Sequence, residues 1–410
     1  MRIVIATQNY FQPNNGQAVF VAHLAEGLAS DGHQVLVMTP SDRRRAYTTT
    51  QGRVRVEAIT ALSLAPWYPD VYVTFRPQKE VARLLESFAP DIVHIQDHFP
   101  LCRSVVRAAR QRRLPLIGTN HFLPENIIPF VPVLSRSARC RRWMERLLWR
   151  MVLRVFDKMG LATAPTETAA ALLRRQGLVV PVYAVSCGVD LDTYRPDPSV
   201  DRAALRRRYG LSPDRPILFF VGRVDREKRL DVLIEALPQL EPAAAQLAIA
   251  GRGRDLAALQ AQAQRLGLAD RVVFVGFVPE ADLPALLNSV DIFAMPSEAE
   301  LLSLATLEAM ATGLPVLAAN ARALPELVEN GVNGYLFRAG DAGDAARRID
   351  QLLCEQHRWG AMGAASLAKA RAHSLQNTIR RYEELYHQTL ALSAPALAAN
   401  APLANPPSSA

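Results

Sequence analysis

Short apolar runs alternate with amphipathic segments along most of the chain. Residues 2–6 are apolar and β-branched, residues 8–16 are polar, and apolar residues then recur at helical spacing. A strand, a loop and a helix in this order form the repeating unit of a parallel α/β sheet. The same signals predict further strands in the first half of the chain at residues 33–39, 54–59, 91–96, 114–119 and 183–186.

The alternation begins again in the second half of the chain. After the irregular residues 187–196, an apolar run at 216–222 is followed by a loop and a helix, much as at the N-terminus. We therefore predict two similar α/β domains with parallel sheets, at residues 1–190 and 191–375, and then a helix at 376–391. Residues 392–410 are mostly Ala, Pro and Ser without charge, so we expect them to be disordered. Further strands are predicted at residues 246–250, 271–277, 291–295, 315–319 and 334–337.

The length of 410 residues, half of them hydrophobic, also favours two domains over one. A formal net charge of +8 favours anionic partners such as nucleotides, nucleic acid or acidic lipid, without choosing among them. The four cysteines are scattered without a Cys-x-x-Cys pair, which predicts neither a disulfide framework nor a zinc site and favours a cytoplasmic setting. We expect no leader segment before the first strand, and no apolar run reaches the roughly 18 residues that cross a bilayer.

The segment from Pro296 to Gly313 combines a strand end, two carboxylates and a helix start. Pro296 ends the apolar run 291–295, and helical spacing of apolar residues follows. Glu300 is expected at the mouth of this helix, where outward N–H groups and the helix dipole favour an anion. Glu308 lies about two turns further, roughly 10 Å away by helical rise, which is too far for a pair of glycosidase carboxylates. The segment therefore suits an extended anionic ligand.

A second candidate lies where the first strand of the second domain ends. Arg223 and Lys228 are five residues apart and span a strand-to-helix loop, so both can reach one anion. Surface cations are ordinary features. Combined with the helix mouth at Glu300, however, this loop predicts a pyrophosphate site. In the first domain, the loop near Gly16, the corner 96–98 and His121 should face one crevice, because ligands of parallel sheets gather at the carboxyl ends of strands.

The segment between Arg136 and Lys158 is basic and amphipathic. Its apolar residues keep a one-face helical period, while most of its charged residues are arginines. One interpretation is a helix that packs its apolar stripe on the domain and leaves the arginines in water. The other adds a surface that contacts anionic membrane, with Trp143 and Trp149 at interfacial depth.

Three other patterns are weak. Gly251-Arg-Gly253 follows a strand but lacks the third glycine of a dinucleotide fingerprint, so a tight turn is the simpler interpretation. Asp190 and Asp192 have the spacing of a metal-bound sugar-nucleotide site but lie in a linker. His94 and His98 lie across a strand end rather than on a helix. No metal site is therefore expected.

Together these motifs resemble the retaining GT-B glycosyltransferases of family 4. The resemblance is carried by the spacing of Glu300 and Glu308 before Gly313, the loop 222–228, the linker 188–190 and the run 324–334, and it extends to about residue 390. It implies an α/β fold of the GT-B type, with two Rossmann-like parallel-sheet domains facing a cleft and a C-terminal helix that returns to the first domain.

The resemblance also implies roles for the matching residues. Arg223 and Lys228 hold the donor diphosphate, and Glu308 binds the ribose hydroxyls. Gly16 lies at the donor phosphates, His121 lies beside the transferring sugar, and Glu300 positions that sugar with neighbouring backbone N–H groups. Those N–H groups belong to Leu301, Leu302, Ser303 and Leu304.

Two departures from the family pattern stand out. The usual Glu-Gly-Phe-Gly run reads Glu-Leu-Leu-Ser at residues 300–303, so side chains replace glycines where the backbone approaches the ligand. The pair Cys187-Gly188 stands where Asn-Gly is common.

The resemblance implies a retaining hexosyltransferase that moves a sugar from a nucleotide diphosphate donor to an acceptor hydroxyl. We expect UDP-glucose as donor; a GDP-mannose-dependent mannosyltransferase and a GT-B-shaped nucleotide-sugar epimerase remain alternatives. The acceptor is expected to be a lipid or a glycan. The basic segment and an apolar run at 127–133 favour a lipid and a peripheral position on the inner face of the membrane. No cofactor or metal is expected to be required, since Arg and Lys neutralise the leaving group. Without aromatics interleaved on a basic sheet, no nucleic-acid partner is expected.

Overall fold

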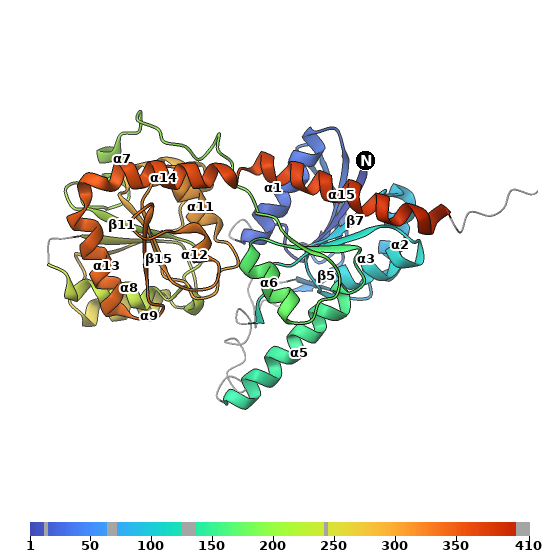
Figure 1. Cartoon of the computed structure of the whole chain (residues 1–410), viewed down its shortest axis with the longest axis horizontal. Coiled ribbons are helices and arrows are strands. Elements are labelled where there is room, and N and C mark those ends of the chain that lie inside the picture. The colour runs from blue at the N-terminus through green and yellow to red at the C-terminus, as the bar shows by residue number, and fades with distance from the viewer. Residues whose placement is uncertain (12–14, 64–71, 125–136, 242–244, 399–410) are drawn as a thin grey trace, which may run out of the picture.

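The computed structural model describes residues 1–11, 15–63, 72–124, 137–241 and 245–398. Two α/β domains lie side by side, and the chain crosses between them twice (Figure 1). The α/β fold class with two parallel-sheet domains is confirmed.

The first domain is built on an eight-stranded sheet in the order β10-β9-β8-β7-β1-β2-β4-β3. All neighbours are parallel except β3 and β4, which are antiparallel. A separate antiparallel pair, β5 and β6, lies outside this sheet. The strands are β1 (Arg2–Ala6), β2 (Gln34–Pro40), β3 (Tyr47–Gln51), β4 (Val54–Ile59), β5 (Ala61–Ser63), β6 (Tyr72–Thr74), β7 (Ile92–Ile95), β8 (Leu116–Thr119), β9 (Leu161–Ala164) and β10 (Val182–Ala184).

Helices cover this sheet and position its loops. Asn15 caps the first of them by accepting from the N–H groups of Gln17 and Ala18. The helices of the domain are α1 (Gly16–Ser30), α2 (Gln78–Phe88), α3 (Pro100–Gln111), α5 (Ala138–Phe156) and α6 (Glu167–Arg175).

The second domain has a six-stranded parallel sheet in the order β13-β12-β11-β14-β15-β16. Its strands are β11 (Ile217–Val221), β12 (Gln246–Ala250), β13 (Val272–Gly276), β14 (Ile292–Met295), β15 (Val316–Ala319) and β16 (Gly334–Phe337). Its α-helices are α7 (Arg202–Arg208), α8 (Leu230–Ala236), α9 (Leu256–Arg265), α10 (Leu283–Ser289), α11 (Leu304–Ala311), α12 (Leu324–Leu327), α13 (Ala342–Cys354) and α14 (Trp359–Ala372). Short 3-10 turns are η3 (Arg226–Lys228), η4 (Leu237–Gln239), η5 (Glu280–Asp282) and η6 (Gln356–Arg358).

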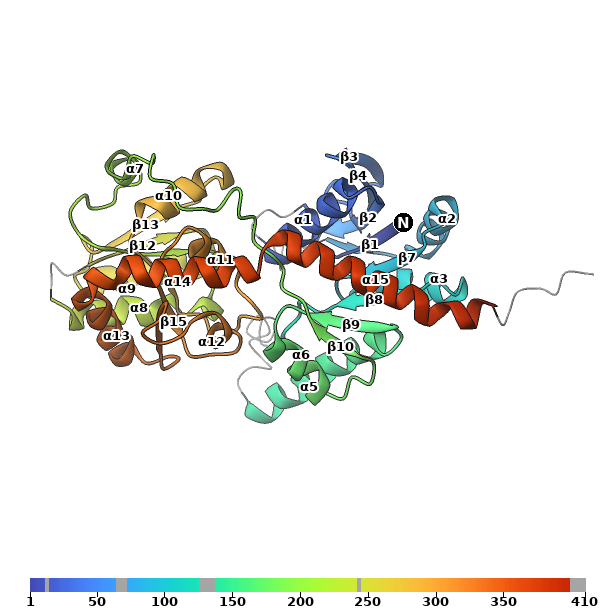
Figure 2. The same cartoon turned by 45° about the horizontal axis from the view of Figure 1, so that its top comes forward.

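The last helix, α15 (Leu375–Ala398), continues the direction of α14 and lies over the first domain (Figures 1 and 2). Ile379 packs where Gly27 of α1 has no side chain; a Cβ at Gly27 would lie 2.1 Å from Ile379 Cδ1. Tyr382 and Tyr386 are fully buried, and the Tyr386 hydroxyl is hydrogen-bonded to His94 Nδ1 at 2.8 Å. These contacts attach α15 to the first sheet.

The prediction of disorder from residue 392 is wrong for residues 392–398, which continue α15. Alanine and leucine favour helix once it has begun, so a lack of charge there did not mean a lack of structure. Residues 399–410 lie outside the described residues.

The two crossings between the domains are hydrogen-bonded to each other. The Val189 N–H donates to His373 O and the Leu375 N–H donates to Val189 O, both at 2.9 Å. Beside this contact Gly188 has φ +77°, and a Cβ there would lie 2.8 Å from Leu375 Cα. Glycine is therefore required for both its backbone conformation and the close approach of the two crossings.

We predict that Gly188→Ala lowers the free energy of unfolding by about 2 kcal/mol or more, since left-handed backbone strain adds to a clash with main-chain atoms. Gly210→Ala is the matched control, because Gly210 has φ +67° with nothing within 4 Å of the added Cβ. It should cost only about 1 kcal/mol. Urea unfolding measures both, and equal losses would show that the crossing is not tightly packed.

Candidate active site

Each sheet has one point at which the strand order reverses, and these two points define the candidate site. In the first sheet β1 lies beside β7, and in the second β11 lies beside β14. Ligands of parallel α/β sheets bind at the carboxyl ends of the strands at such reversals. The loops that follow these four strands carry Gly16, the corner 96–98, the pair Arg223 and Lys228, and Glu300.

In the second domain, the loops after β11 and β14 meet through an ion pair. Lys228 Nζ donates to Glu300 Oε1, and both side chains are largely buried. Burial alone would raise the pKa of Glu300, but the charges of Lys228 and Arg223 and a hydrogen bond from Ser297 hold it below its usual value. Arg223 also binds Asp225 and Glu227, at 2.6 and 2.5 Å. Arg223 and Lys228, the two cations predicted to bind phosphate, therefore both lie close enough to Glu300 to lower its pKa.

Hydrogen bonds to the main chain also join the same two loops. The Glu298 N–H and Ser297 Oγ both donate to Glu227 O, at 3.3 and 3.2 Å. Arg229, with φ +51°, binds Asp231 behind this turn and pairs with Glu298. Lys228 is thus positioned by its backbone as well as by its partner.

The helix after β14 begins later than predicted. Residues 297–303 form a loop, and α11 starts at Leu304 with Ser303 as N-cap, so Glu300 precedes the helix instead of standing at its mouth. Of the four predicted N–H groups, only that of Leu304 belongs to the first turn of α11; those of Leu301, Leu302 and Ser303 lie in the loop.

Ser303 explains one departure from the family pattern. It has φ +89° and its Oγ accepts from the Thr306 N–H at 3.3 Å. This is the position where the family pattern has its second glycine, and a positive φ is the conformation that glycine adopts without strain. Here a serine adopts this strained conformation and also caps the N-terminus of α11.

The first domain contacts α11 at Gly16. It is the first residue of α1, and a Cβ on it would lie 3.7 Å from Leu304 Cδ1. Thr166 Oγ1 donates to Leu301 O at 2.9 Å, and the Thr168 N–H donates to Glu326 Oε1 at 2.7 Å. We call these contacts, from Gly16, Thr166 and Thr168 to residues 301–304 and Glu326, the interdomain junction.

Sequence reasoning missed two residues of this junction. Thr166 caps α6 through the Ala169 N–H and also binds the loop after β14, while Glu326 accepts from the first N–H groups of α6 across the junction. Thr166 before a helix was a readable capping signal. Nothing local to Glu326 indicates that it caps a helix of the other domain.

The first-domain side of the site is a hydrogen-bonded polar cluster. His121 Nε2 is hydrogen-bonded to Gln96 Oε1 at 3.0 Å, and Gln17 Nε2 donates to Gln96 O and Asp97 Oδ2, both at 3.2 Å. The structure therefore brings together the loop near Gly16, the corner 96–98 and His121, as predicted. Burial lowers the pKa of His121 to about 3, so its imidazole is neutral at physiological pH.

Two buried polar atoms beside this cluster have no hydrogen-bond partner in the part of the chain that the structure describes. They are Gln8 Oε1 and His98 Nδ1. Gln8 and His98 flank Asp97, which accepts from the Gln8 N–H at 2.6 Å, and the His98 ring stacks on Phe99. Buried polar atoms are seldom left unpaired, so each of these two atoms has capacity for one further hydrogen bond.

Glu308 lies on α11, away from the ion pair. It is hydrogen-bonded to the side chain of Tyr194, which follows the linker, and Glu280 adds a like charge nearby. Burial and then the charge of Glu280 raise the pKa of Glu308 to about 7. Its carboxylate is therefore poorly solvated and suited to accept hydroxyl hydrogen bonds.

The weak sequence motifs have structural explanations. Cβ atoms at Gly251 and Gly253 would lie 1.8 Å from Gly222 O and 2.1 Å from Val224 O, so these glycines allow two loops to pack. Asp190 accepts from Thr193 Oγ1 at 2.6 Å and closes a turn. Within the described residues, no three His, Cys, Asp or Glu side chains form a metal site.

The basic helix α5 has the predicted apolar stripe, but its two tryptophans differ. Trp149 is buried in the first domain, whereas Trp143 is 57% exposed. The prediction that both lie at interfacial depth is therefore wrong for Trp149. The apolar run 127–133 and Arg136 lie outside the described residues. None of the described helices is both long and apolar enough to span a bilayer.

We predict that Glu308→Gln changes the pH dependence of stability. The pKa of Glu308 rises from 4.5 to about 7 on folding, so the wild type loses stability between these values, where the unfolded chain releases its proton first. Relative to wild type, the variant should therefore gain about 1 to 3 kcal/mol between pH 5 and pH 8. Urea unfolding at both pH values measures this gain.

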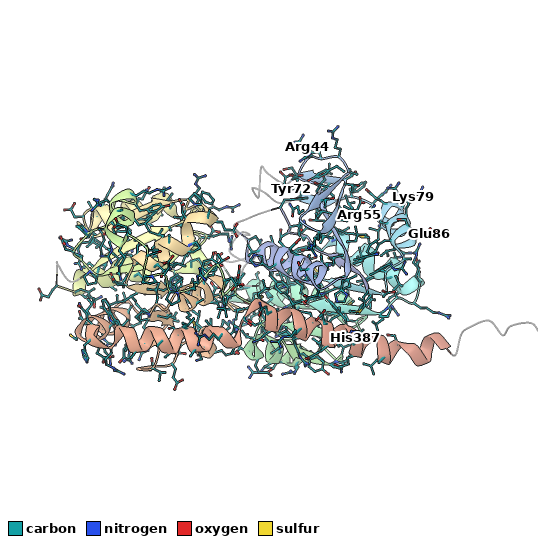
Figure 3. All side chains as sticks on the ribbon, turned by 90° about the horizontal axis from the view of Figure 1, so that it is seen from above. Arg44, Arg55, Tyr72, Lys79, Glu86 and His387 are labelled. Atoms are coloured by element: carbon teal, nitrogen blue, oxygen red, sulfur yellow. The ribbon has the colours of Figure 1, made fainter. Side chains whose placement is uncertain are left out.

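The exposed Glu86 on α2 serves as the control for that experiment (Figure 3). Glu86→Gln should leave the pH dependence as in wild type. The same result for Glu308→Gln would mean that the pKa of Glu308 does not change on folding.

Comparisons with known proteins agree with this fold. The family description "Glycosyltransferase Family 4" matches residues 14–193, and "Glycosyl transferases group 1" matches residues 201–366. The HepE protein of Anabaena in complex with UDP-glucose has the same fold, with a TM-score of 0.76 at 20% identity over 95% of this chain and 100% of that chain.

Two curated relatives extend the likeness. A D-inositol 3-phosphate glycosyltransferase of Nocardia farcinica is 31% identical over 76% of this chain and 69% of its own. A GDP-mannose-dependent alpha-(1-6)-phosphatidylinositol monomannoside mannosyltransferase of Mycolicibacterium smegmatis is 40% identical over 43% of this chain, and the match spans about half of that relative, 48%. With both domains matched by family descriptions, the chain belongs to family 4 of the glycosyltransferases and has the GT-B fold.

Proposed function

We propose that this protein is a retaining hexosyltransferase that moves glucose from UDP-glucose to a hydroxyl group of a membrane lipid. One observation carries the donor site: Arg223 and Lys228 converge on Glu300 at the strand-order reversal of the second sheet, next to α11 and Gly16 of the opposite domain. A sugar diphosphate has the charge and length for this arrangement, with Glu308 further along α11 for the ribose.

In this mechanism the two cations stabilise the leaving diphosphate. The bond between the sugar C1 and the diphosphate oxygen breaks, the acceptor oxygen bonds to C1 on the same face, and a phosphate oxygen takes the acceptor proton. Negative charge develops on the diphosphate, where Lys228 and Arg223 are already positioned by Glu300 and Glu227. Lys228 then exchanges a carboxylate partner for a phosphate. We therefore expect activity to survive chelation of divalent metals.

The polar cluster of the first domain is the proposed acceptor side. His121 is neutral and bonded to Gln96, so it orients hydroxyl groups near the sugar without adding charge. Gln8 Oε1 and His98 Nδ1 supply two unpaired buried atoms for a polyol head group. The acceptor therefore presents hydroxyl groups rather than an apolar chain to this cluster.

A lipid acceptor and a peripheral position on the inner membrane face are supported by chemistry outside the site. The chain has a net charge of +8, and α5 places arginines and an exposed Trp143 on one projecting helix. The mannosyltransferase of Mycolicibacterium smegmatis is named for phosphatidylinositol monomannoside. Anionic lipid attracts such a basic surface.

A GDP-mannose-dependent mannosyltransferase is the second candidate, because that relative is named for GDP-mannose. A thermal-shift panel of UDP, GDP, ADP and their sugars separates the donors, since a ligand at 100 times its Kd stabilises by about 2.7 kcal/mol. The proposal expects the largest shift with UDP-glucose. A larger shift with GDP-mannose would transfer the assignment to mannose. Isomerisation of the donor without any acceptor would identify an epimerase instead.

We predict that Lys228→Ala lowers kcat/KM for the donor by roughly 10² to 10³, the scale for losing one electrostatic contact in the transition state. Lys79→Ala is the control, because Lys79 projects outward from α2 (Figure 3). Steady-state transfer assays measure both variants. A Lys228 variant within threefold of wild type would remove this residue from the mechanism.

A further inference from the structure

A second concave surface lies between α3 and α5. It encloses about 220 Å³ and is lined by Arg103, Val106, Met151, Arg154, Val155 and Lys158. Three cations and three apolar side chains thus surround one cavity. None of these residues belongs to the polar cluster, the ion pair or the interdomain junction.

The helical spacing of the lining residues explains the mixed chemistry. Met151 and Val155 are four residues apart on α5, Arg154 lies between them in sequence on the same helix, and Lys158 lies in the turn directly after it. Arg103 comes from α3, where its Nε donates to His98 O at 2.7 Å. That bond fixes the guanidinium at the cavity.

The cations of this cavity are not neutralised. No described residue forms an ion pair or hydrogen bond with the side chain of Arg154 or Lys158, or with the two terminal nitrogens of Arg103. Elsewhere in the protein, cations such as Arg206 and Lys228 pair closely with Asp291 and Glu300. Three unpaired cations around one cavity favour an anionic ligand.

The position of α5 indicates that the anion belongs to a membrane lipid. The helix projects from the first domain with its N-terminal end furthest out (Figure 1), and Trp143 and Leu147 on it are 57% and 36% exposed. Exposed apolar residues flanked by arginines suit the interface of an anionic membrane. Diffuse charge alone would attract nucleic acid equally, but a cavity with apolar walls suits an amphiphile with a compact anionic head.

We propose that the cavity between α3 and α5 binds the phosphate head group of an anionic phospholipid and holds the protein at the membrane. This site is separate from the donor site, and it adjoins the acceptor cluster through the hydrogen bond from Arg103 to His98 O. It rests on the membrane association in the proposed function, but not on the identity of the donor.

The test is flotation of the full-length protein, without donor, on phosphatidylcholine vesicles with and without phosphatidylglycerol. Wild type should bind only the anionic vesicles, and glycerol 3-phosphate should compete for part of this binding. Arg154→Gln with Lys158→Gln should weaken binding roughly 30-fold, about fivefold for each cation at the surface. Because no sugar transfer is measured, this result is independent of the donor assignment.

Two control variants separate the cavity from net charge. Arg265→Gln with Arg371→Gln removes the same charge from exposed positions of the second domain and should leave binding unchanged. Met151→Trp fills the cavity while keeping every charge, and should weaken binding although the protein unfolds at the same temperature.

Four outcomes would overturn the proposal. Equal loss of binding in the two charge variants, or wild-type binding in Met151→Trp, would show that diffuse attraction suffices and that the cavity binds no head group. Wild type that binds glycerol 3-phosphate in solution but never floats would show a free phosphate ester as ligand instead of a lipid. Wild type that binds neither would remove both the cavity and the membrane association, and leave the donor assignment intact.

Discussion

The contact between Lys228 and Glu300 is the constraint on which the candidate site depends. An ammonium and a carboxylate that are largely buried cost desolvation energy, and their attraction does little more than offset it. Such a pair is therefore better explained by positioning than by stability. It holds together the two loops that follow the neighbouring strands β11 and β14. In the proposed mechanism, a diphosphate would replace the carboxylate beside a cation that is already in place.

The same constraint reaches the other domain through α11. The loop that carries Glu300 also contacts Thr166, and the helix that follows it contacts Gly16. Opposite this junction, the two crossings pair with each other and α15 is fastened to the first sheet by Tyr386 and His94. The domains are therefore joined at one side by paired chain segments and at the other by a few polar contacts.

Much of the fold could be read from the chain because buried parallel strands are nearly continuous apolar runs. The runs at residues 2–6, 216–222 and 246–250 are of this kind, and they contain the strands β1, β11 and β12 of the structure. Strand β9 was missed because Leu-Ala-Thr-Ala is short and contains mostly small residues. Strand β3, Tyr-Thr-Thr-Thr-Gln, was missed because it is a polar edge strand with little buried surface.

The amino-acid sequence alone determined the two-domain pattern, the loops that carry the chemistry and the chemical type of each side chain. It could not determine that Glu326 caps a helix of the other domain, that Glu308 faces Tyr194 and Glu280, or that Arg154 and Arg103 share a cavity. Local patterns report spacing along one segment. The burial of a side chain, its pKa and its hydrogen-bond partners instead depend on charged and apolar residues from distant segments of the chain. Only folding brings these residues together.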